Sequence, residues 1–522
     1  MKVLNTLIAA SLAVSGVASG EPKDFMYANV SGAEVNSSPV AKPTPDSDTG
    51  EVSWEVTPVA PSAERISEPP VQASVQAEKS EVVFAEIPAA YRADPKVVIK
   101  NVSFKGNTVI SDSALANVAE SFLARPVEMT DLEELRIRLT RLYTDQGYVN
   151  SGAILPAQQV DNGQIEYQIV EGTLESVNIE GAGRLRNDYI ASRVLKNAAS
   201  PFNTKTLESN FRELLDNPLI ERMDGELSAL PGQGTSALNL KIKRATPYNF
   251  TVEGNNHASP SLGAEQIRLS GLVRNISGFG DALSVTAVSS DSRTSLSTGY
   301  SVPLNSNDTT LTIQVSASDS GVIEEPLDTI DIESSTEGVD LSLSHPLRSS
   351  LQKRLAVGVG LAVRKNQNLL AGEPFPFSTG EVDGASKVSV LRTWQDYVRR
   401  KGAAVLAARS TFKLGLDAFG ATQHNDSRPD GQFISWQAQL QYARRYLEDR
   451  AQLLLKMDAQ VANHELLPLE RFSIGGANSV RGYRENEVVR DQAVFVSAEY
   501  RYRLGSSDNF GTWTLAPFFD AG

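Results

Sequence analysis

Ionisable side chains recur at every second position in two segments near the C-terminus. Lys456 and Asp458 are two residues apart, and Glu499, Arg501 and Arg503 repeat the same spacing. In a β-strand, side chains two positions apart lie on the same face of the sheet, so each set would point in one direction. Acidic and basic groups that share a face can form ion pairs and line a wet, polar surface. We therefore predict two strands with a charged face.

The residue types that usually carry catalysis or bind metal ions form no recognisable constellation. Cysteine is absent, which excludes disulfides, thiolate metal sites and cysteine nucleophiles, and no phosphate-binding loop occurs. Ser350 and Lys353 fit a Ser-x-x-Lys pattern, but this pattern is frequent by chance and here lies at the start of a predicted strand. We therefore predict no enzyme activity, no metal site and no cofactor. The four histidines are scattered without ligand spacing: His257, His345, His424 and His464.

Length and composition leave a β-rich membrane protein possible. The chain has 522 residues, more than one domain usually requires. Its mean hydropathy is −0.23, and it lacks an apolar run of about 18 residues, which excludes a bundle of membrane-spanning helices. A β-barrel is not excluded, because barrel strands alternate between apolar and polar residues. The net charge of −14 disfavours nucleic acid as a partner, and the 37 glycines favour β-structure.

The N-terminus predicts export. After a positively charged start, residues 4–17 form a short apolar stretch and residues 18–20 are small, so we predict a signal peptide over 1–20. A buried N-terminal helix is the alternative, but the next segment would provide no core for it. Residues 21–92 are predicted to form an acidic, proline-rich linker, with 12 acidic and 4 basic residues over 21–88, a net charge of −8. Export without cysteine favours the periplasm or outer membrane of a Gram-negative cell.

Residues 97–245 contain two copies of a module of about 75 residues. Val102 and Val177 lie 75 positions apart, and three further pairs share this offset. Each copy begins with a strand that ends at a turn glycine, Gly106 or Gly181, and continues with a short helix, a longer helix and two strands. The predicted order is therefore β-α-α-β-β in both copies. The further pairs are Gly106 with Gly181, Leu132 with Leu207, and Pro156 with Pro231.

The longer helix of each copy has polar residues at its expected start. Thr130 or Asp131 is the predicted N-cap in the first copy, and Asn203 or Thr204 in the second. Leucines at spacings of three and four residues follow each cap, which predicts an apolar face that packs on a sheet.

This order of elements resembles the POTRA domain, the polypeptide-transport-associated domain. The first copy, 93–172, carries the clearer match through residues 104–108 and 143–148, and the second copy is 173–245. The resemblance implies a free strand edge and a helix–strand groove, to which an extended segment of another protein can add through main-chain hydrogen bonds. Two small α+β spacers without a binding role are the alternative.

Residues 246–522 alternate between apolar and polar residues with a period of two. Residues 311–318, 434–442 and 494–504 are examples, and each run has about the length of a tilted membrane-spanning strand. We predict about thirteen such strands in an antiparallel β-barrel, with apolar side chains toward lipid and polar ones in a wet lumen. A soluble β-sandwich is the alternative. Outward aromatic residues suit the membrane interfaces: Trp436, Tyr442, Tyr502 and Trp513.

Connections of two lengths separate these strands. Residues 278–281 predict a short turn, whereas 319–335 and 366–383 predict long loops. Short turns at one end and long loops at the other are expected of a barrel in the outer membrane.

Two motifs near the C-terminus resemble those of the outer-membrane two-partner-secretion transporters of the TpsB type, the hemolysin secretion/activation family. Val480-Arg481-Gly482-Tyr483 resembles the element of the long sixth surface loop, here about 464–490, which folds back into the barrel in that family. Residues 518–522 resemble the Phe-x-Asp-x-Gly element of its thirteenth strand. Two POTRA modules also suit this family better than its barrel-assembly relatives.

Strand alternation supports a contact between the two motifs. Asp520 lies on the opposite face from Phe519 and so points into the lumen. If the loop folds inward as the resemblance implies, Arg481 enters a confined space, where an unpaired charge costs roughly 3–5 kcal/mol. We therefore predict a bidentate Arg481–Asp520 pair, with Gly482 allowing a close approach of the loop backbone and Tyr483 packing against the wall. Two solvated, unpaired side chains are the alternative.

The resemblance implies a function in protein export. The POTRA modules would bind an unfolded secreted exoprotein, an adhesin or hemolysin for example, and a monomeric barrel in outer-membrane lipid would pass it to the surface without ATP. A barrel-assembly factor is the alternative of the same class, and a passive porin or adhesin that of another class. The family closes its barrel with sixteen strands. Thirteen strands ending at Gly522 thus predict a truncated chain that lacks roughly 45–60 residues, at about 10 per strand plus loops.

Overall fold

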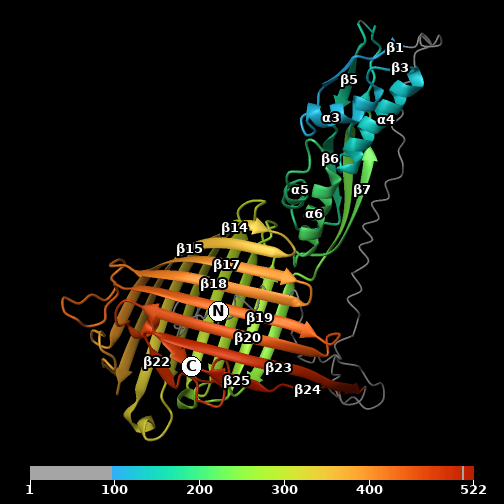
Figure 1. Ribbon diagram of the computed structural model, residues 1–522. Helices are drawn as coiled ribbons and strands as arrows, with labels where there is room; N and C mark the ends of the chain where they lie inside the picture. The colour runs from blue at the N-terminus through green and yellow to red at the C-terminus, as the bar shows by residue number, and fades with distance from the viewer. Residues whose placement is uncertain (1–96, 161, 508–510) are drawn as a thin grey trace. The chain divides into compact units, whose positions relative to one another are not determined.

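The computed structural model describes residues 97–522 except 161 and 508–510 (Figure 1). The predicted signal peptide and linker lie outside the described residues. The chain divides into two compact units between Thr246 and Pro247. No helix among the described residues is long and apolar enough to span a membrane.

The first half of the N-terminal unit is a three-stranded sheet with helices packed on it. Strand β2 pairs in parallel with the central strand β5, and β4 pairs antiparallel on its other side. Apolar side chains from α3, α4 and β5 form one buried core, including Leu115, Leu135, Leu139 and Ile165. The elements are β1 (Val97–Val98), β2 (Asn101–Lys105), α3 (Asp112–Ala119), η2 (Glu120–Phe122), β3 (Pro126–Val127), α4 (Met129–Asp145), β4 (Gly152–Ile154) and β5 (Gln164–Val170).

The second half repeats this arrangement with its own core. Its sheet order is β6-β8-β7, again with a parallel and an antiparallel neighbour of the central strand. The predicted β-α-α-β-β order is confirmed in both halves, and the first adds the short pair β1 and β3. The elements are β6 (Thr173–Glu180), α5 (Asn187–Val194), α6 (Thr204–Leu215), β7 (Ile220–Ala229) and β8 (Thr235–Arg244).

One predicted helix cap was wrong and one was right. In the first half Glu128 is the N-cap of α4, and Asp131 lies at the third helical position, where its carboxylate accepts a hydrogen bond from the Glu128 backbone N–H at 2.8 Å. This reciprocal arrangement begins the helix earlier than a cap at Thr130 or Asp131 would. In the second half Asn203 caps α6, as predicted, and accepts from two backbone N–H groups.

The turn glycines occupy equivalent positions in the two halves. Gly106 and Gly181 have φ values of +93° and +81°. A Cβ on Gly106 would collide with the carbonyl oxygen of Ile169 in β5, and one on Gly181 with that of Ile242 in β8. Each glycine therefore lets the turn pass directly over the central strand, which explains the repeated offset in the sequence.

Replacing Gly181 by alanine is expected to destabilise the second half by about 1–3 kcal/mol, since the new Cβ meets backbone and the φ is strained. Urea unfolding of a fragment containing residues 97–246 measures the loss. Glu180→Ala, which truncates an exposed neighbouring side chain, is the control and should change stability by less than about 0.5 kcal/mol. Equal stabilities for Gly181→Ala and wild type would contradict the close approach.

A carboxylate holds the turn that follows Gly106. Glu171 accepts hydrogen bonds from the backbone N–H groups of Thr108 and Val109 at 2.6 and 2.9 Å, and from the hydroxyls of Thr108 and Tyr143. Burial opposes ionisation, but these hydrogen bonds outweigh it and hold the pKa of Glu171 below its usual value. The ionised form therefore stabilises the turn, and this contribution is lost as pH falls through the folded-state pKa.

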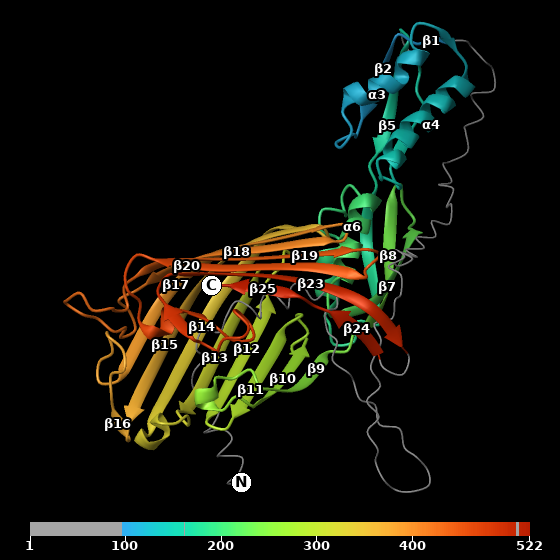
Figure 2. The same ribbon diagram turned by 60° about the horizontal axis from the view of Figure 1, so that its bottom comes forward.

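The C-terminal unit is one antiparallel sheet of 15 strands (Figures 1 and 2). Thirteen follow one another in the path from β9 to β24, which agrees with the predicted number, while β16 (Glu373–Pro374) pairs with β15 and β25 (Phe518–Ala521) with β23. The path is β9 (Tyr248–Asn255), β10 (Gln266–Arg274), β11 (Ala282–Ser290), β12 (Arg293–Pro303), β13 (Thr310–Gly321), β14 (Ile332–Ser349), β15 (Lys353–Leu370), β17 (Ala385–Lys401), β18 (Ala404–Gly415), β19 (Ile434–Tyr446), β20 (Ala451–Ala462), β23 (Ala493–Ser507) and β24 (Gly511–Leu515).

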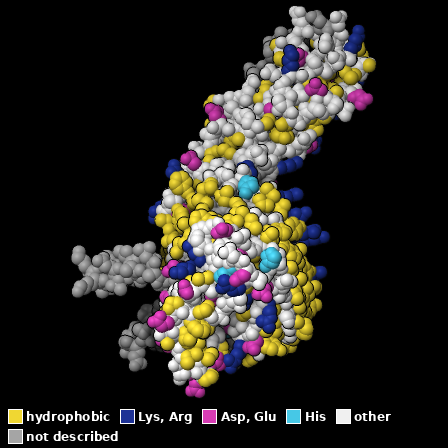
Figure 3. Space-filling view, turned by 90° about the vertical axis from the view of Figure 1, so that its left-hand side faces the viewer, with side chains coloured by type: hydrophobic (Ala, Val, Ile, Leu, Met, Phe, Trp, Pro, Cys, Tyr) yellow, Lys and Arg dark blue, Asp and Glu magenta, His cyan; other side chains and the backbone are white. Residues whose placement is uncertain are grey.

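The two faces of this sheet differ as the alternation predicts. Large apolar side chains on one face are exposed, for example Ile313, Val315, Val339 and Leu341 at 44–48%. Figure 3 shows hydrophobic side chains around the periphery of this unit. The other face carries serine, threonine, glutamine and charged side chains, and Figures 1 and 2 show the sheet curled around it. This architecture is the predicted barrel type, with an apolar exterior and a polar lumen.

The predicted long loops are shorter than expected. Strand β13 runs to Gly321 and β14 begins at Ile332, so pairing continues into the segment 319–335. Likewise β15 runs to Leu370, inside the segment 366–383. Where both faces of a hairpin meet water, its residues no longer alternate between apolar and polar. The backbone hydrogen bonds between the strands continue there, so the alternation in the sequence underestimates strand length.

Candidate functional site: a loop folded against the lumen wall

A long connection between β20 and β23 folds onto the lumen face of the sheet. We call it L6, residues 463–492, close to the predicted 464–490. It contains the short helix η5 (Pro468–Glu470) and the strands β21 (Phe472–Ile474) and β22 (Val488–Arg490), which pair antiparallel. The contacts of its Val480-Arg481-Gly482-Tyr483 motif and of η5 form the candidate functional site.

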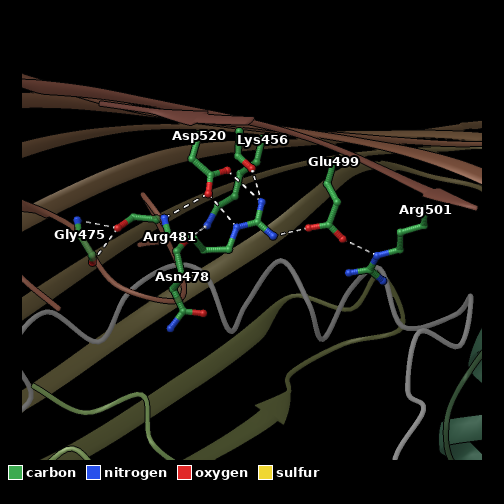
Figure 4. Close-up of polar contacts among 9 residues, drawn as sticks. Lys456, Gly475, Asn478, Arg481, Glu499, Arg501 and Asp520 are labelled. Atoms are coloured by element: carbon green, nitrogen blue, oxygen red, sulfur yellow. Dashed lines mark hydrogen bonds and ion pairs between the residues drawn. The ribbon is translucent and has the colours of Figure 1, made fainter. Parts of the chain in front are cut away.

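Arg481 of L6 forms a bidentate ion pair with Asp520 of β25 (Figure 4). Its Nε and Nη2 donate to the two carboxylate oxygens at 2.7 and 2.9 Å, and its backbone N–H donates at 3.1 Å. The Asp520 side chain is only 2% exposed. Asp520 lies opposite Ser497 in the ladder, which places it on the lumen face as alternation predicts.

Further groups on the same face surround the guanidinium. Arg481 Nη1 forms an ion pair with Glu499, and Arg501 donates to the other oxygen of Glu499 at 2.6 Å. The Phe518 ring lies 3.6 Å from Arg481 Cζ, a cation–π distance. We call Arg481, Asp520, Glu499 and Phe518 the Arg481 cluster. Because every part of the guanidinium has a partner, the cluster can hold L6 firmly in a confined space.

The other charges predicted to face the lumen divide into two groups. Lys456 donates to the carbonyl of Asn478 in L6 at 2.9 Å (Figure 4). It also lies 3.7 Å from Asp458. These residues therefore extend the contact between L6 and the wall. Arg503 lies beyond Arg501 on the same strand, and among the described residues no ion pair or side-chain hydrogen bond joins it to L6.

Two neighbours of Arg481, Gly482 and Tyr483, were assigned roles from the sequence, and both assignments were wrong. Val480 is buried, at 9% exposure, whereas Tyr483 is 65% exposed and does not pack against the wall. A Cβ on Gly482 would meet nothing within 4 Å, so this glycine is not needed for close approach. Its φ of +93° lies in the left-handed region, which glycine adopts without strain.

A second anchor of L6 was missed. Glu470 of η5 is buried, and its carboxylate contacts Arg364 of β15 at 3.2 Å and Lys413 of β18 at 2.9 Å. The partners are 106 and 57 residues away in sequence, so spacing could not reveal them. The available signal was an acid that directly follows Leu466-Leu467-Pro468-Leu469, because a carboxylate in an apolar segment needs a buried partner.

Comparison with known families identifies this architecture. Residues 234–522 match the family model described as haemolysin secretion/activation protein ShlB/FhaC/HecB. The chain belongs to the haemolysin secretion/activation family. Residues 97–172 match the ShlB-type POTRA domain. The predicted family, the two-part fold and the outer-membrane location with periplasmic POTRA domains are confirmed, and the family consists of transporters rather than enzymes.

Known relatives of the chain are identical to it at about a fifth of the aligned positions. The outer membrane transporter CdiB of Dickeya dadantii is 22% identical over 444 residues, covering 82% of this chain and 76% of the relative. The heme/hemopexin transporter protein HuxB of Haemophilus influenzae is 20% identical over 432 residues, covering 80% and 74%. The structure of CdiB from Escherichia coli superimposes with a TM-score of 0.62 at 22% identity, covering 84% and 82%, and has the same fold.

Proposed function

We propose that the protein exports an unfolded partner exoprotein across the outer membrane. The POTRA modules bind the exoprotein in the periplasm, the barrel passes it to the cell surface, and L6 controls the lumen. The observation that carries this proposal is the Arg481 cluster. It holds a loop against the lumen wall through ion pairs and hydrogen bonds, which can break and form again. A reversible plug suits a transporter whose cargo must pass the position the loop occupies.

The POTRA modules can bind the exoprotein by strand addition, which does not require a particular exoprotein sequence. Strand β2 is one edge of the first POTRA sheet and β6 one edge of the second, with no strand beyond either among the described residues. Main-chain hydrogen bonds to such an edge accept an extended chain of almost any composition. An unfolded exoprotein offers extended segments, whereas folded proteins keep theirs paired.

Export in this scheme uses no nucleotide. The periplasm lacks ATP, and the sequence carries no phosphate-binding loop. Folding of the exoprotein at the surface then prevents its return and makes passage directional.

Co-expression tests the proposal. The full chain is produced together with candidate secreted exoproteins from the same genome, and each exoprotein is measured in the medium and at the cell surface. We expect export that depends on the transporter and stops when residues 97–245 are deleted. Barrel-assembly function would instead appear as a loss of several unrelated outer-membrane proteins on depletion. A pore that conducts ions but exports nothing and binds no exoprotein would support a passive porin.

A further inference from the structure

L6 consists of two parts with different kinds of contact. We call residues 466–474 together with 488–491 the root, and residues 475–487 the tip. The root joins an apolar cluster on the lumen face, in which Leu466 and Leu467 are fully buried. The cluster also contains Leu469 of the root and wall residues Val388, Val390, Phe433 and Ala462. If the root left the wall, these apolar side chains would return to water and the favourable free energy of their burial would be lost.

Buried polar contacts reinforce the root. The Glu470 carboxylate lies between Arg364 and Lys413, and the backbone carbonyl of Glu470 accepts a hydrogen bond from the Gln460 side chain at 2.9 Å. The same Gln460 amide donates to the carbonyl of Asp491 at the other end of the root, at 3.2 Å. Undocking the root would thus expose apolar side chains and leave Arg364 and Lys413 without their carboxylate.

The tip is held mainly by polar contacts, including the buried Asp520 carboxylate, whereas the root adds an apolar cluster to its ion pairs. Arg481 pairs with the wall, Lys456 donates to the Asn478 carbonyl, and Arg484 contacts Glu324 at 2.6 Å near the surface loops. The Arg484 and Glu324 side chains are 60% and 35% exposed. Val480 is the buried apolar residue of this segment. The tip can therefore leave the wall at a smaller cost than the root.

A pair of glycines lies where root and tip meet. Gly475 and Gly476 have φ values of +116° and +96°, in the left-handed region that other residues rarely adopt. They follow directly after β21, the last element of the root on this side. Two adjacent glycines allow a large change in backbone direction on this side, and on the return side Asn486, with a φ of +59°, precedes β22 and provides the second pivot, so β21 and β22 can stay paired.

We propose that L6 is a hinged arm, in which the root stays docked during export and only the tip swings about Gly475–Gly476. Glu470 is then a positioning residue that keeps the hinge at a fixed point on the wall. This inference rests on the proposed function and specifies which part of the loop opens the lumen. Release of the tip breaks the Arg481 cluster, whereas the Glu470 contacts persist.

One wall residue allows both parts to be tethered in a matched way. A Cβ on Gly522 would lie 2.8 Å from Ile474 Cγ2 in the root and 3.2 Å from Val480 Cγ2 in the tip. The pairs Ile474→Cys with Gly522→Cys and Val480→Cys with Gly522→Cys should therefore both form disulfides, and the native chain has no cysteine to interfere. Both disulfides use position 522 on the wall. One joins it to the root, before the hinge, and the other joins it to the tip, after the hinge.

The full-length protein is purified, placed in a planar bilayer, and its ion current in potassium chloride is recorded before and after reduction. We expect the Val480–Gly522 disulfide to suppress open-state transitions at least tenfold, with recovery on reduction. The Ile474–Gly522 disulfide should leave them at the level of its reduced form. Gel mobility with and without reductant verifies that each disulfide has formed.

Two outcomes would overturn the hinge. Equal suppression by both disulfides would mean that L6 leaves the lumen as a whole, and no suppression by either would mean that the tip need not move. The current needs no exoprotein, so it decides the hinge even if wild-type protein fails to export its partner. Export by each oxidised cysteine variant is measured in parallel. It should fall in the Val480–Gly522 variant and stay unchanged in the Ile474–Gly522 variant.

Discussion

Export by the Arg481→Ala protein is expected to fall at least tenfold while the barrel remains inserted in the outer membrane. The change removes the two side-chain hydrogen bonds to the carboxylate of Asp520 and the ion pair with Glu499. It leaves the carboxylates of Asp520 and Glu499 on a largely buried face, where Arg501 still contacts Glu499. Breaking a buried pair costs roughly 3–5 kcal/mol, and the partly exposed Arg481 places the cost near the lower value.

A loss of about 3 kcal/mol changes the ratio of docked to released tip by roughly two orders of magnitude. The tip is then released most of the time and no longer alternates between a docked and a released position, which export requires in this scheme. We therefore expect larger and noisier ion currents together with the reduced export. Export is measured as exoprotein in the medium, and insertion as the amount of heat-modifiable barrel in purified outer membranes.

Two further variants test whether bidentate geometry matters. Arg481→Lys keeps the charge but offers a point donor, so export should lie between the alanine variant and wild type. Arg503→Ala removes a lumen-facing charge outside the Arg481 cluster and should leave export unchanged. Normal export and an unchanged current in Arg481→Ala would disprove the role of the cluster.

The sequence predicted what depends on periodicity and missed what depends on loop conformation. The face on which Asp520 and Glu499 lie follows from a period of two, so their common direction was predictable. The exposure of Tyr483 depends on the conformation of the loop backbone around Gly482, and no pattern of side chains predicts that conformation. Arg481 itself was assigned by resemblance, because a loop that folds inward has no periodic signal.

The contacts of Glu470 were not predicted because they join segments that are far apart in the sequence. Arg364 and Lys413 lie on lumen faces of strands that the alternation predicts, but alternation cannot tell which loop residue fills the space between them. Glu470 follows an apolar run that resembles a strand or a core segment. Only the folded loop brings this carboxylate between the two cations.

Glu470→Gln is expected to destabilise the docked root by roughly 3–5 kcal/mol, although the side chain keeps its size. Glu470 is 2% exposed, and without its charge Arg364 and Lys413 face each other unneutralised on the lumen wall. Thermal unfolding of the purified barrel, followed by its heat-modifiable mobility, measures the loss. Glu465→Gln is the matched control, because this exposed glutamate lies only five residues earlier in the same loop.

A double-mutant cycle separates the ion pair from general damage to the loop. Lys413→Met alone should be destabilising, since it leaves Glu470 with Arg364 as its remaining close cation. In the Glu470→Gln background the same change should cost about 1–3 kcal/mol less, because it then removes an unpaired cation. Additive losses would mean that the two side chains do not act together. In that case the apolar residues Leu466 and Leu467, rather than Glu470, would hold the root against the wall.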